Sequence, residues 1–375
     1  IDLTNYLNQI HKVNYSKNYW EQIIGMWLFD FLTIVLEKYL IVKKFKNLPN
    51  TSVYKINSKN NLHSDNSRES AKFFNSHIWN NEIFCFFIKK LKNKIQFKSI
   101  LVNKNRNILV EKKISFEKVK IYIIKIFSII TMRFKKKKEI FIIHSYLKLF
   151  DEILLQFKVN GLIKLNRVSL FTSKIKYNKK IRNIYRVSKN NDKFINLIAP
   201  ILVKNMPKTF IEDYKNILKF SNNLSWPKKP QKIFTSVSNF YDDVFKIWCA
   251  EIKRKNFTKL FFCCHGGGFQ TNRFSNEKVY LLNTCDKILT WGKNKDKSKK
   301  IVSFFNIKSS SKPFQIINKN SLLSSNILLV QDMPRPYTSF LDSSFLHLSE
   351  YKKAVKIQSQ FIQKLNTEKR KKVLV

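Results

Sequence analysis

The sequence predicts an α/β protein with a Rossmann-like parallel sheet flanked by helices, preceded by a helical N-terminal part. Short apolar runs alternate with amphipathic stretches over residues 232–292, an alternation typical of parallel strands joined by helices. A glycine-rich turn follows one of these runs at 266–268. A further apolar run at 327–330 is followed by a helical pattern, which predicts the start of a second α/β domain.

The N-terminal part is predicted to be helical. Over residues 20–45 the apolar side chains recur at steps of three and four, which indicates an amphipathic helix with a wide buried stripe. The polar, Asn- and Ser-rich residues 46–71 are expected to run over the surface. Further helices are predicted at 78–91 and 121–132. The lysine run 135–138 ends a helix, where cations are favourable.

The middle of the chain leads toward the sheet. Residues 139–144 form a short apolar run, and helices are predicted at 146–157 and 210–220. The Lys- and Asn-rich residues 165–190 are expected to be a loop or a weakly ordered insertion. Residues 226–230, Trp-Pro-Lys-Lys-Pro, are expected to be extended, because each proline disfavours helix at the residue before it.

The sheet and the domain organisation are predicted from the second half of the chain. Strands are predicted at 232–236, 260–264, 287–291 and 327–330, and helices at 242–253, 276–283 and 351–365. Residues 371–375 begin another strand. We therefore expect a first domain at 1–292 with its sheet at 232–292, a linker at 293–325, and the start of a truncated second domain at 326–375.

The chain is strongly basic, with 71 Lys and Arg against 25 Asp and Glu and a formal net charge of +46. Lys, Asn, Ile and Phe are abundant together, so a strongly AT-biased genome explains the excess without any partner. A basic surface would still attract nucleic acid, anionic lipid or sugar nucleotides. The basic runs carry no interleaved aromatics and no zinc-finger or homeodomain pattern, so nucleic acid is the least favoured of these partners.

Composition excludes several other classes of protein. Apolar residues make up 44% of the chain, enough to bury a core, and the 6 Gly and 8 Pro exclude collagen-like and linker-like chains. The five cysteines form no CxxC pair, and no His/Cys spacing or HExxH pattern appears, so we expect no metal site. The most apolar stretches run 12 to 13 residues, too short to span a bilayer, which predicts a soluble or peripheral protein.

The clearest local signal is the turn Cys263-Cys-His265-Gly266-Gly267-Gly268. In parallel sheets ligands bind beyond the carboxyl ends of the strands. Consecutive glycines let backbone N–H groups approach a phosphate or carboxylate, and His265 could bind a phosphate or act as an acid or base. A tight strand-to-helix turn with a capping histidine fits the same residues. No GxxxxGK[ST] pattern is present, so the turn is not a P-loop.

Two further groups of residues are candidates for the site. Asp242 and Asp243 open a helix just after a strand, where either could act as a general base or hold an acceptor hydroxyl, or could simply stabilise the helix N-terminus. His11 and Ser16 belong to a polar and aromatic cluster at the start of the first long helix, for which Ser16 is a plausible N-cap.

Widely spaced blocks of residues together resemble a family of bacterial cell-surface carbohydrate transferases. The blocks are His11, Asn14, Ser16 and Tyr19-Trp20 with Ile24-Gly25 and Trp27-Leu28; Trp226 to Pro230; Ile233 to Ser236; Asp242-Asp243 to Trp248; His265-Gly266-Gly267; Asp286 with Trp291-Gly292; Ile327 to Val330; and Leu341 to Ser344. They follow the order of the family and cover most of the chain, which makes the resemblance more specific than one glycine turn.

The resemblance implies a GT-B-like pair of Rossmann-like domains that bind a nucleotide-activated sugar between them, with no cofactor beyond this donor. It implies an enzyme of surface polysaccharide synthesis in the cytoplasm, peripheral at the inner face of the membrane, with a glycan or lipid-linked acceptor. The catalytic residues would be His265, Asp242 and Asp243. The substrate-binding residues would be Gly266, Gly267, Gly268, His11, Ser16 and Ser236.

The chain also departs from the resembled pattern. The family has an aromatic-Gly pair after His-Gly-Gly, whereas Phe269 is followed here by Gln270. The next helix of the family carries acidic residues around a histidine, whereas Glu277 is the nearby acid here. If that cluster is catalytic, this copy is weak or inactive. The alternative function is therefore a non-catalytic, degenerate fragment or a basic protein that binds nucleic acid or a membrane surface.

Overall fold

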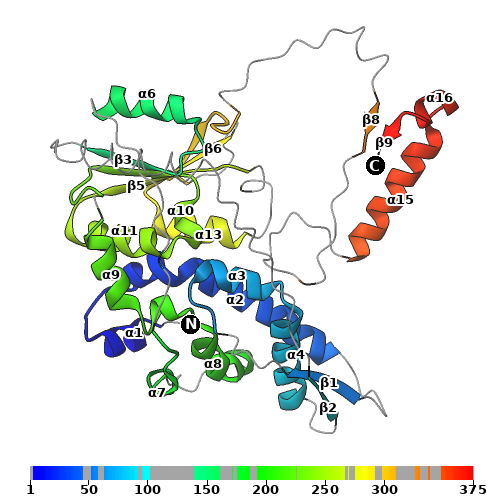
Figure 1. Ribbon diagram of the computed structural model, residues 1–375, viewed down its shortest axis with the longest axis horizontal. Helices are drawn as coiled ribbons and strands as arrows, with labels where there is room; N and C mark the ends of the chain where they lie inside the picture. Colours follow the sequence, from blue (N-terminus) through cyan, green and yellow to red (C-terminus); the bar gives the residue numbers. More distant parts are fainter. Residues whose placement is uncertain are drawn as a thin grey trace.

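The fold is presented as a computed structural model with three parts: an N-terminal helical layer, a central parallel sheet with its helices, and a small C-terminal unit (Figure 1). The residues that it describes are 3–44, 52–57, 63–91, 95–101, 139–160, 171, 175–185, 192–224, 226–266, 269, 275–291, 298–309, 326–329, 337 and 348–374. The helix expected at 121–132 and the lysine run 135–138 lie outside these residues.

The N-terminal layer is built around one long helix, α2 (Lys17–Lys44), which confirms the helix expected at 20–45. Its apolar side chains form a wide buried stripe, and Lys43 and Lys44 in its last turn complement the helix dipole. The first half of the chain also gives this layer α1 (Thr4–His11), β1 (Ser52–Asn57), α3 (Ser67–Phe74), α4 (His77–Leu91) and β2 (Gln96–Leu101). The strands β1 and β2 pair in parallel. The segment at 46–71, expected to run over the surface, contains the strand β1 and the start of the helix α3.

Four more elements complete this layer before the chain returns to the sheet. They are α7 (Lys179–Arg182), α8 (Lys193–Asn205), η1 (Lys208–Phe210) and α9 (Tyr214–Asn222). The helix expected at 210–220 begins later, at Tyr214, because the chain first makes the short 3-10 turn η1 after Pro207. The element α7 lies inside the segment expected to be a loop at 165–190.

The central sheet has five parallel strands in the order β3-β4-β5-β6-β7. They are β3 (Ile140–Ile143), β4 (Lys232–Thr235), β5 (Lys259–Cys263), β6 (Lys287–Trp291) and β7 (Ile301–Phe304). The three strands expected between 232 and 291 are confirmed. The sheet is wider than expected, because the apolar run at 139–144 supplies β3, and β7 lies within the polar segment expected to link two domains.

Helices cover both faces of this sheet (Figure 1). On one face lie α10 (Ser238–Tyr241), α11 (Asp243–Lys255) and α13 (Asn276–Thr284), and on the other lies α6 (Leu149–Asn160). The helix α2 packs beneath α11 and α13, so these helices have apolar contacts on two sides. The parallel sheet flanked by helices confirms the predicted fold class.

The core lies between the sheet, the helices α11 and α13, and α2. Trp27 and Phe31 from α2 are fully buried, as are Phe245 and Trp248 from α11. Each of these aromatic side chains buries a large apolar area, so the α2 contact holds the N-terminal layer firmly to the sheet domain. All five cysteines are buried and free.

The C-terminal unit is a small parallel β-α-β arrangement. Strand β8 (Ile327–Leu328) pairs in parallel with β9 (Val373–Leu374), and α15 (Leu348–Lys364) and α16 (Thr367–Arg370) lie between them in the chain. The helix expected at 351–365 corresponds to α15. The division of the chain into two domains and a linker stays a prediction.

Candidate functional site

Three neighbouring strands of the sheet end side by side, and a histidine or serine lies within two residues of each end. In the ladder Ile143 lies opposite Thr235, and Thr235 lies opposite Phe262. The residues that follow are therefore neighbours as well, and the Ser236 N–H donates to the His144 carbonyl at 3.0 Å. We call the edge formed by residues 144–146, 236–238 and 264–266 the carboxyl edge. Ligands of parallel α/β proteins bind at such edges.

His265 is the central side chain of the carboxyl edge. Its ring is stacked on Tyr146, with centroids 5.0 Å apart and an interplanar angle of 24°. Phe240 and Phe262 lie beside it, at centroid distances of 6.2 and 6.5 Å. Its Nδ1 is buried and has no hydrogen-bond partner in the part of the chain that the structure describes. A buried polar atom without a partner is rare, so this nitrogen is a candidate to bind a ligand.

The electrostatic surroundings keep the His265 imidazole neutral. Burial lowers the pKa of His265 below 6.5, and the positive charge of Lys308 lowers it further, against a contact with the Ser236 backbone that raises it. The Lys308 ammonium also lies 5.5 Å from the centre of the Tyr146 ring. An anion bound here would be attracted by Lys308 and would favour the protonated imidazole.

The loop after β3 has an unusual backbone. His144 and Tyr146 have φ angles of 48° and 64°, in the left-handed region that residues other than glycine seldom adopt. Side-chain contacts hold this loop: the His144 Nδ1 and the Ser238 hydroxyl are 2.7 Å apart, and the Ser145 hydroxyl donates to Glu152 Oε2 at 2.5 Å. Such conformations each cost about 1–3 kcal/mol and cluster at functional sites.

The glycine turn opens toward solvent at its first residue. A Cβ atom added to Gly266 would meet nothing within 4 Å, and the backbone of Gly266 is outside the left-handed region. Neither packing nor backbone geometry therefore requires glycine at this position, which leaves room for a ligand. Gly267 and Gly268 lie outside the described residues, and their expected role in binding stays a prediction.

Asp242 begins α11 and is buried with one free oxygen. Its Oδ1 accepts from the Phe245 N–H at 3.0 Å and caps the helix, whereas Oδ2 is buried without a partner among the described residues. Burial, reinforced by the negative charge of Asp243, raises the pKa of Asp242 to about 7. A carboxyl group with this pKa can exchange a proton near neutral pH.

Asp243 faces the N-terminal layer and not the carboxyl edge. Its carboxylate accepts from the Ser67 N–H at 2.9 Å, the Ser67 hydroxyl at 2.6 Å and the Thr209 hydroxyl at 2.8 Å. It also forms an ion pair with the buried Lys246 at 2.8 Å. These four contacts use both oxygens, so the structure gives Asp243 a structural role that joins α11 to α3 and η1.

His11 and Ser16 lie together near the start of α2, apart from the carboxyl edge. His11 is buried, with its ring against Trp20 and Tyr214 at centroid distances of 5.6 and 4.4 Å. Its Nε2 lies 2.9 Å from the Phe210 carbonyl, to which the Nε2–H tautomer donates. Burial lowers the pKa of His11 to about 4, so its ring is neutral and serves packing.

Ser16 is exposed and has two features. Its hydroxyl accepts from the Tyr19 N–H at 3.3 Å, as expected for the N-cap of α2. It also lines a cavity of about 230 Å³ between α2, α11 and α13, together with Gln22, Arg254 and Asn283. A ligand in this cavity could reach Ser16 but not His11, whose ring is covered.

The structure therefore unites only some of the residues expected to form one site. Ser236 and His265 share the carboxyl edge, although the Ser236 hydroxyl is buried and donates to the Ser145 carbonyl at 3.2 Å. Asp242 lies on the connection that runs from the carboxyl end of β4 to α11. The sequence did not single out His144, Tyr146 or Lys308 as site residues. The available signal was their position, because the first two directly follow a strand.

The helix at which the chain departs from the resembled pattern serves packing. On α13 the Tyr280 side chain is buried, and its hydroxyl lies 2.9 Å from the Gln22 carbonyl and 3.1 Å from the Asn239 carbonyl. A Cβ atom at Gly25 of α2 would lie 3.0 Å from the Tyr280 ring. Gly25 therefore allows α2 and α13 to approach closely.

Comparison with known protein families places the chain in a family. The family model described as LIC12162 family transferase matches residues 2–375. The chain belongs to the LIC12162 family of transferases. No curated protein and no solved structure gave a significant match. The family confirms the transferase part of the resemblance and does not specify a donor or an acceptor.

The described residues hold neither a cluster of metal-binding side chains nor a helix suited to cross a membrane. They contain no group of three or more His, Cys, Asp and Glu side chains placed to hold a metal ion. None of their helices combines the length and the apolar character that a bilayer crossing requires.

Proposed function

We propose that this transferase moves a glycosyl group from a nucleotide-activated sugar to an acceptor in surface-glycan synthesis. The donor phosphate would bind at the carboxyl edge. The observation that carries the proposal is His265, whose buried Nδ1 has no partner among the described residues, beside the cation Lys308. A phosphate group would supply the missing hydrogen-bond partner and neutralise the positive charge.

The chemistry would consist mainly of positioning and charge stabilisation. The acceptor hydroxyl oxygen would attack the anomeric carbon as the bond from this carbon to the nucleotide phosphate oxygen breaks. Negative charge then develops on the phosphate, where a donating imidazole and a nearby ammonium stabilise the transition state. His265 and Lys308 are placed for these two roles. The Tyr146 ring would orient His265 by stacking.

The proton of the acceptor hydroxyl needs a base. Asp242 is the candidate, since its pKa of about 7 allows the carboxylate to form at neutral pH and its Oδ2 has no hydrogen bond within the described chain. The scheme needs no metal ion and no cofactor besides the donor. A glycan or lipid-linked acceptor, and contact of the basic surface with anionic lipid at the inner face of the membrane, are parts of the same proposal.

A thermal-shift screen against CMP-, UDP-, GDP- and CDP-linked sugars tests the donor site. We expect one class of nucleotide sugar to raise the melting temperature of the wild type and not that of His265→Ala. The matched control is His77→Ala, because His77 is exposed on α4, in the N-terminal layer. Failure of every nucleotide sugar to shift the wild type would refute the donor. An unchanged shift in His265→Ala would refute the site.

A further inference from the structure

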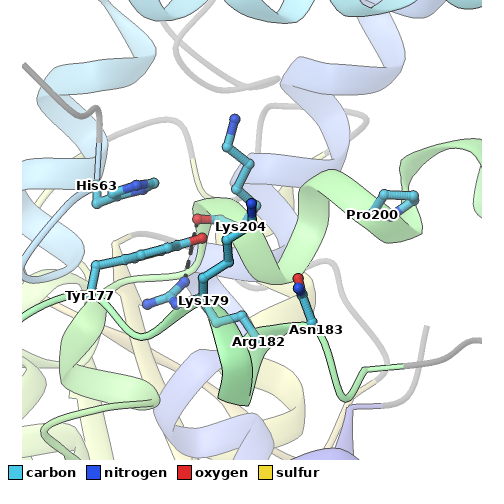
Figure 2. Close-up of a pocket in the computed structure, with 7 residues that line it drawn as sticks. All are labelled: His63, Tyr177, Lys179, Arg182, Asn183, Pro200 and Lys204. Atoms are coloured by element: carbon cyan, nitrogen blue, oxygen red, sulfur yellow. Dashed lines mark hydrogen bonds between the residues drawn. The ribbon is translucent and has the colours of Figure 1, made fainter. Parts of the chain in front are cut away.

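A second, positively charged pocket lies in the N-terminal layer at α7 and α8. These two helices lie on the side of α2 away from the sheet (Figure 1). The pocket has a volume of about 270 Å³. The residues that line it are His63, Tyr177, Lys179, Arg182, Asn183, Pro200 and Lys204. They come from α7 and the residue after it, from α8, and from the segments before α3 and α7 (Figure 2). Three cations and a histidine thus gather around one cavity.

Two rings and a guanidinium form one wall of the pocket. The His63 and Tyr177 rings are stacked nearly parallel, with centroids 3.5 Å apart and an interplanar angle of 7°. The Arg182 guanidinium lies 4.4 Å from the centre of the Tyr177 ring, on the side opposite His63 (Figure 2). This stack fixes the position of the His63 imidazole before any ligand binds.

Arg182 supplies charge but no free hydrogen bond. It donates to both Glu212 oxygens, at 2.7 and 2.6 Å, and to the carbonyls of Val203 and Met206, at 2.5 and 2.7 Å. Arg182 and Glu212 are both buried, and the paired carboxylate compensates the buried charge. Arg182 is therefore a fixed part of the fold and not a group that would contact a ligand.

The groups that remain available face the cavity. Lys179 is exposed and makes no ion pair with a carboxylate in the described part of the chain. Lys204 pairs with Glu82 at 2.6 Å, but both side chains are about half-exposed, and such pairs are weak. The His63 Nδ1 is buried and has no partner among the described residues. A ligand in the cavity could thus contact the Lys179 ammonium, the Lys204 ammonium in place of its weak pair with Glu82, and the His63 Nδ1.

The surroundings of His63 favour its neutral form. Burial, reinforced by the positive charges of Arg182 and Lys204, lowers the pKa of His63 to about 4, although Glu82 and Glu212 oppose this shift. The imidazole is therefore neutral at pH 7 and its Nδ1 has no partner. An anion between His63, Lys179 and Lys204 would give the His63 Nδ1 a hydrogen-bond partner and would balance the positive charge around it.

We propose that this pocket is a binding site for a phosphate-bearing anion, held by Lys179, Lys204 and the His63 imidazole. The site is separate from the carboxyl edge and does not depend on the proposed function. The fixed position of His63 and the compact cavity favour a compact multiply charged group, such as a pyrophosphate or a phosphate monoester. Binding draws a proton onto His63, so affinity rises as the pH falls.

Calorimetric titration with inorganic pyrophosphate tests the site. We expect Lys179→Gln and Lys204→Gln each to weaken binding about tenfold or more, because each removes a charge-assisted contact. The matched control is Lys193→Gln, an exposed lysine on the same helix as Lys204, with no expected change. Circular dichroism melting of each variant establishes that it is folded. No binding at millimolar pyrophosphate, or equal weakening in Lys193→Gln, would overturn the proposal.

NMR of the full chain with labelled histidines separates this site from the carboxyl edge. His63 is assigned by its loss in His63→Gln. We expect pyrophosphate to shift the His63 resonances and to raise the pKa of His63 from its low value. On acidification, the affinity of wild type for pyrophosphate should then increase more than the affinity of His63→Gln. Pyrophosphate is protonated to the same extent in both titrations, so the difference between the two proteins reports on His63. Shifts confined to His144 and His265 would assign the ion to the carboxyl edge and overturn the proposal.

Discussion

Replacing Asp243 by alanine should destabilise the fold without acting on chemistry. The Lys246 side chain is fully buried, and its ammonium forms an ion pair with the Asp243 carboxylate at 2.8 Å and donates to the Ser67 hydroxyl at 3.0 Å. Without the carboxylate the ammonium loses its counter-charge, and the Ser67 N–H and the Thr209 hydroxyl lose an acceptor. Removing one member of a buried ion pair costs about 3–5 kcal/mol.

A double-mutant cycle with Lys246→Met separates this explanation from a simple loss of packing. Methionine has a similar volume and no charge, so Asp243→Ala/Lys246→Met should regain at least about half of the stability lost in Asp243→Ala. The assay is urea unfolding followed by tryptophan fluorescence, with the free energy of unfolding compared across the four proteins. If the losses of unfolding free energy in Asp243→Ala and Lys246→Met simply add up in the double variant, the structural role of Asp243 is refuted. An Asp243→Ala protein that keeps its stability but has lost transfer activity would refute it as well.

Three further predictions follow from buried groups. Asp242→Asn keeps an N-cap but cannot ionise. Between pH 3.8 and about 7 the folded wild type binds more protons at this site than the unfolded chain, so wild type loses stability as the pH rises through this window. In urea unfolding, the free energy of unfolding of the variant relative to wild type should therefore be about 2–4 kcal/mol higher at pH 8 than at pH 4. The pKa of His11 is lowered from 6.5 to about 4, so its neutral form contributes stability that is lost as the pH falls through this range. In an acid unfolding titration, His11→Gln should lose less unfolding free energy than wild type over the same range. Gly25→Ala should destabilise by about 1 kcal/mol, because overpacking against Tyr280 outweighs the gain in helix propensity, and chemical denaturation should show no loss when Tyr280→Leu is also present.

Much of the sheet could be predicted because its strands are short apolar runs between clear helices. The strands β4, β5 and β6 and the helices α11 and α13 lie within a few residues of the expected positions. The strand β7 was missed because Ile301 to Phe304 is a brief run inside a lysine-rich segment. It is a strand because it pairs with β6, a tertiary contact that no local pattern reveals.

The candidate site could be predicted only in part. His265 was found because a buried strand and a glycine turn surround it in the sequence. His144 and Tyr146 lie about 120 residues earlier, and only the pairing of β3 with β4 brings them to the same edge. Conversely, Asp243 and His11 have residue types suited to a site, but contacts with Lys246 and Phe210 place them in the interior. Residue type and local pattern cannot show which side chains the fold buries.

The turnover of His265→Ala, measured beside its melting temperature, tests the carboxyl edge as the site of transfer most directly. The donor is the nucleotide sugar identified by the thermal-shift screen, and His77→Ala serves again as the control. We predict that His265→Ala loses about 100-fold or more in turnover, the expected effect of removing a group that stabilises transition-state charge, while the melting temperature stays close to that of wild type. Full turnover together with a melting temperature several degrees lower would make His265 a structural residue and contradict the proposed site.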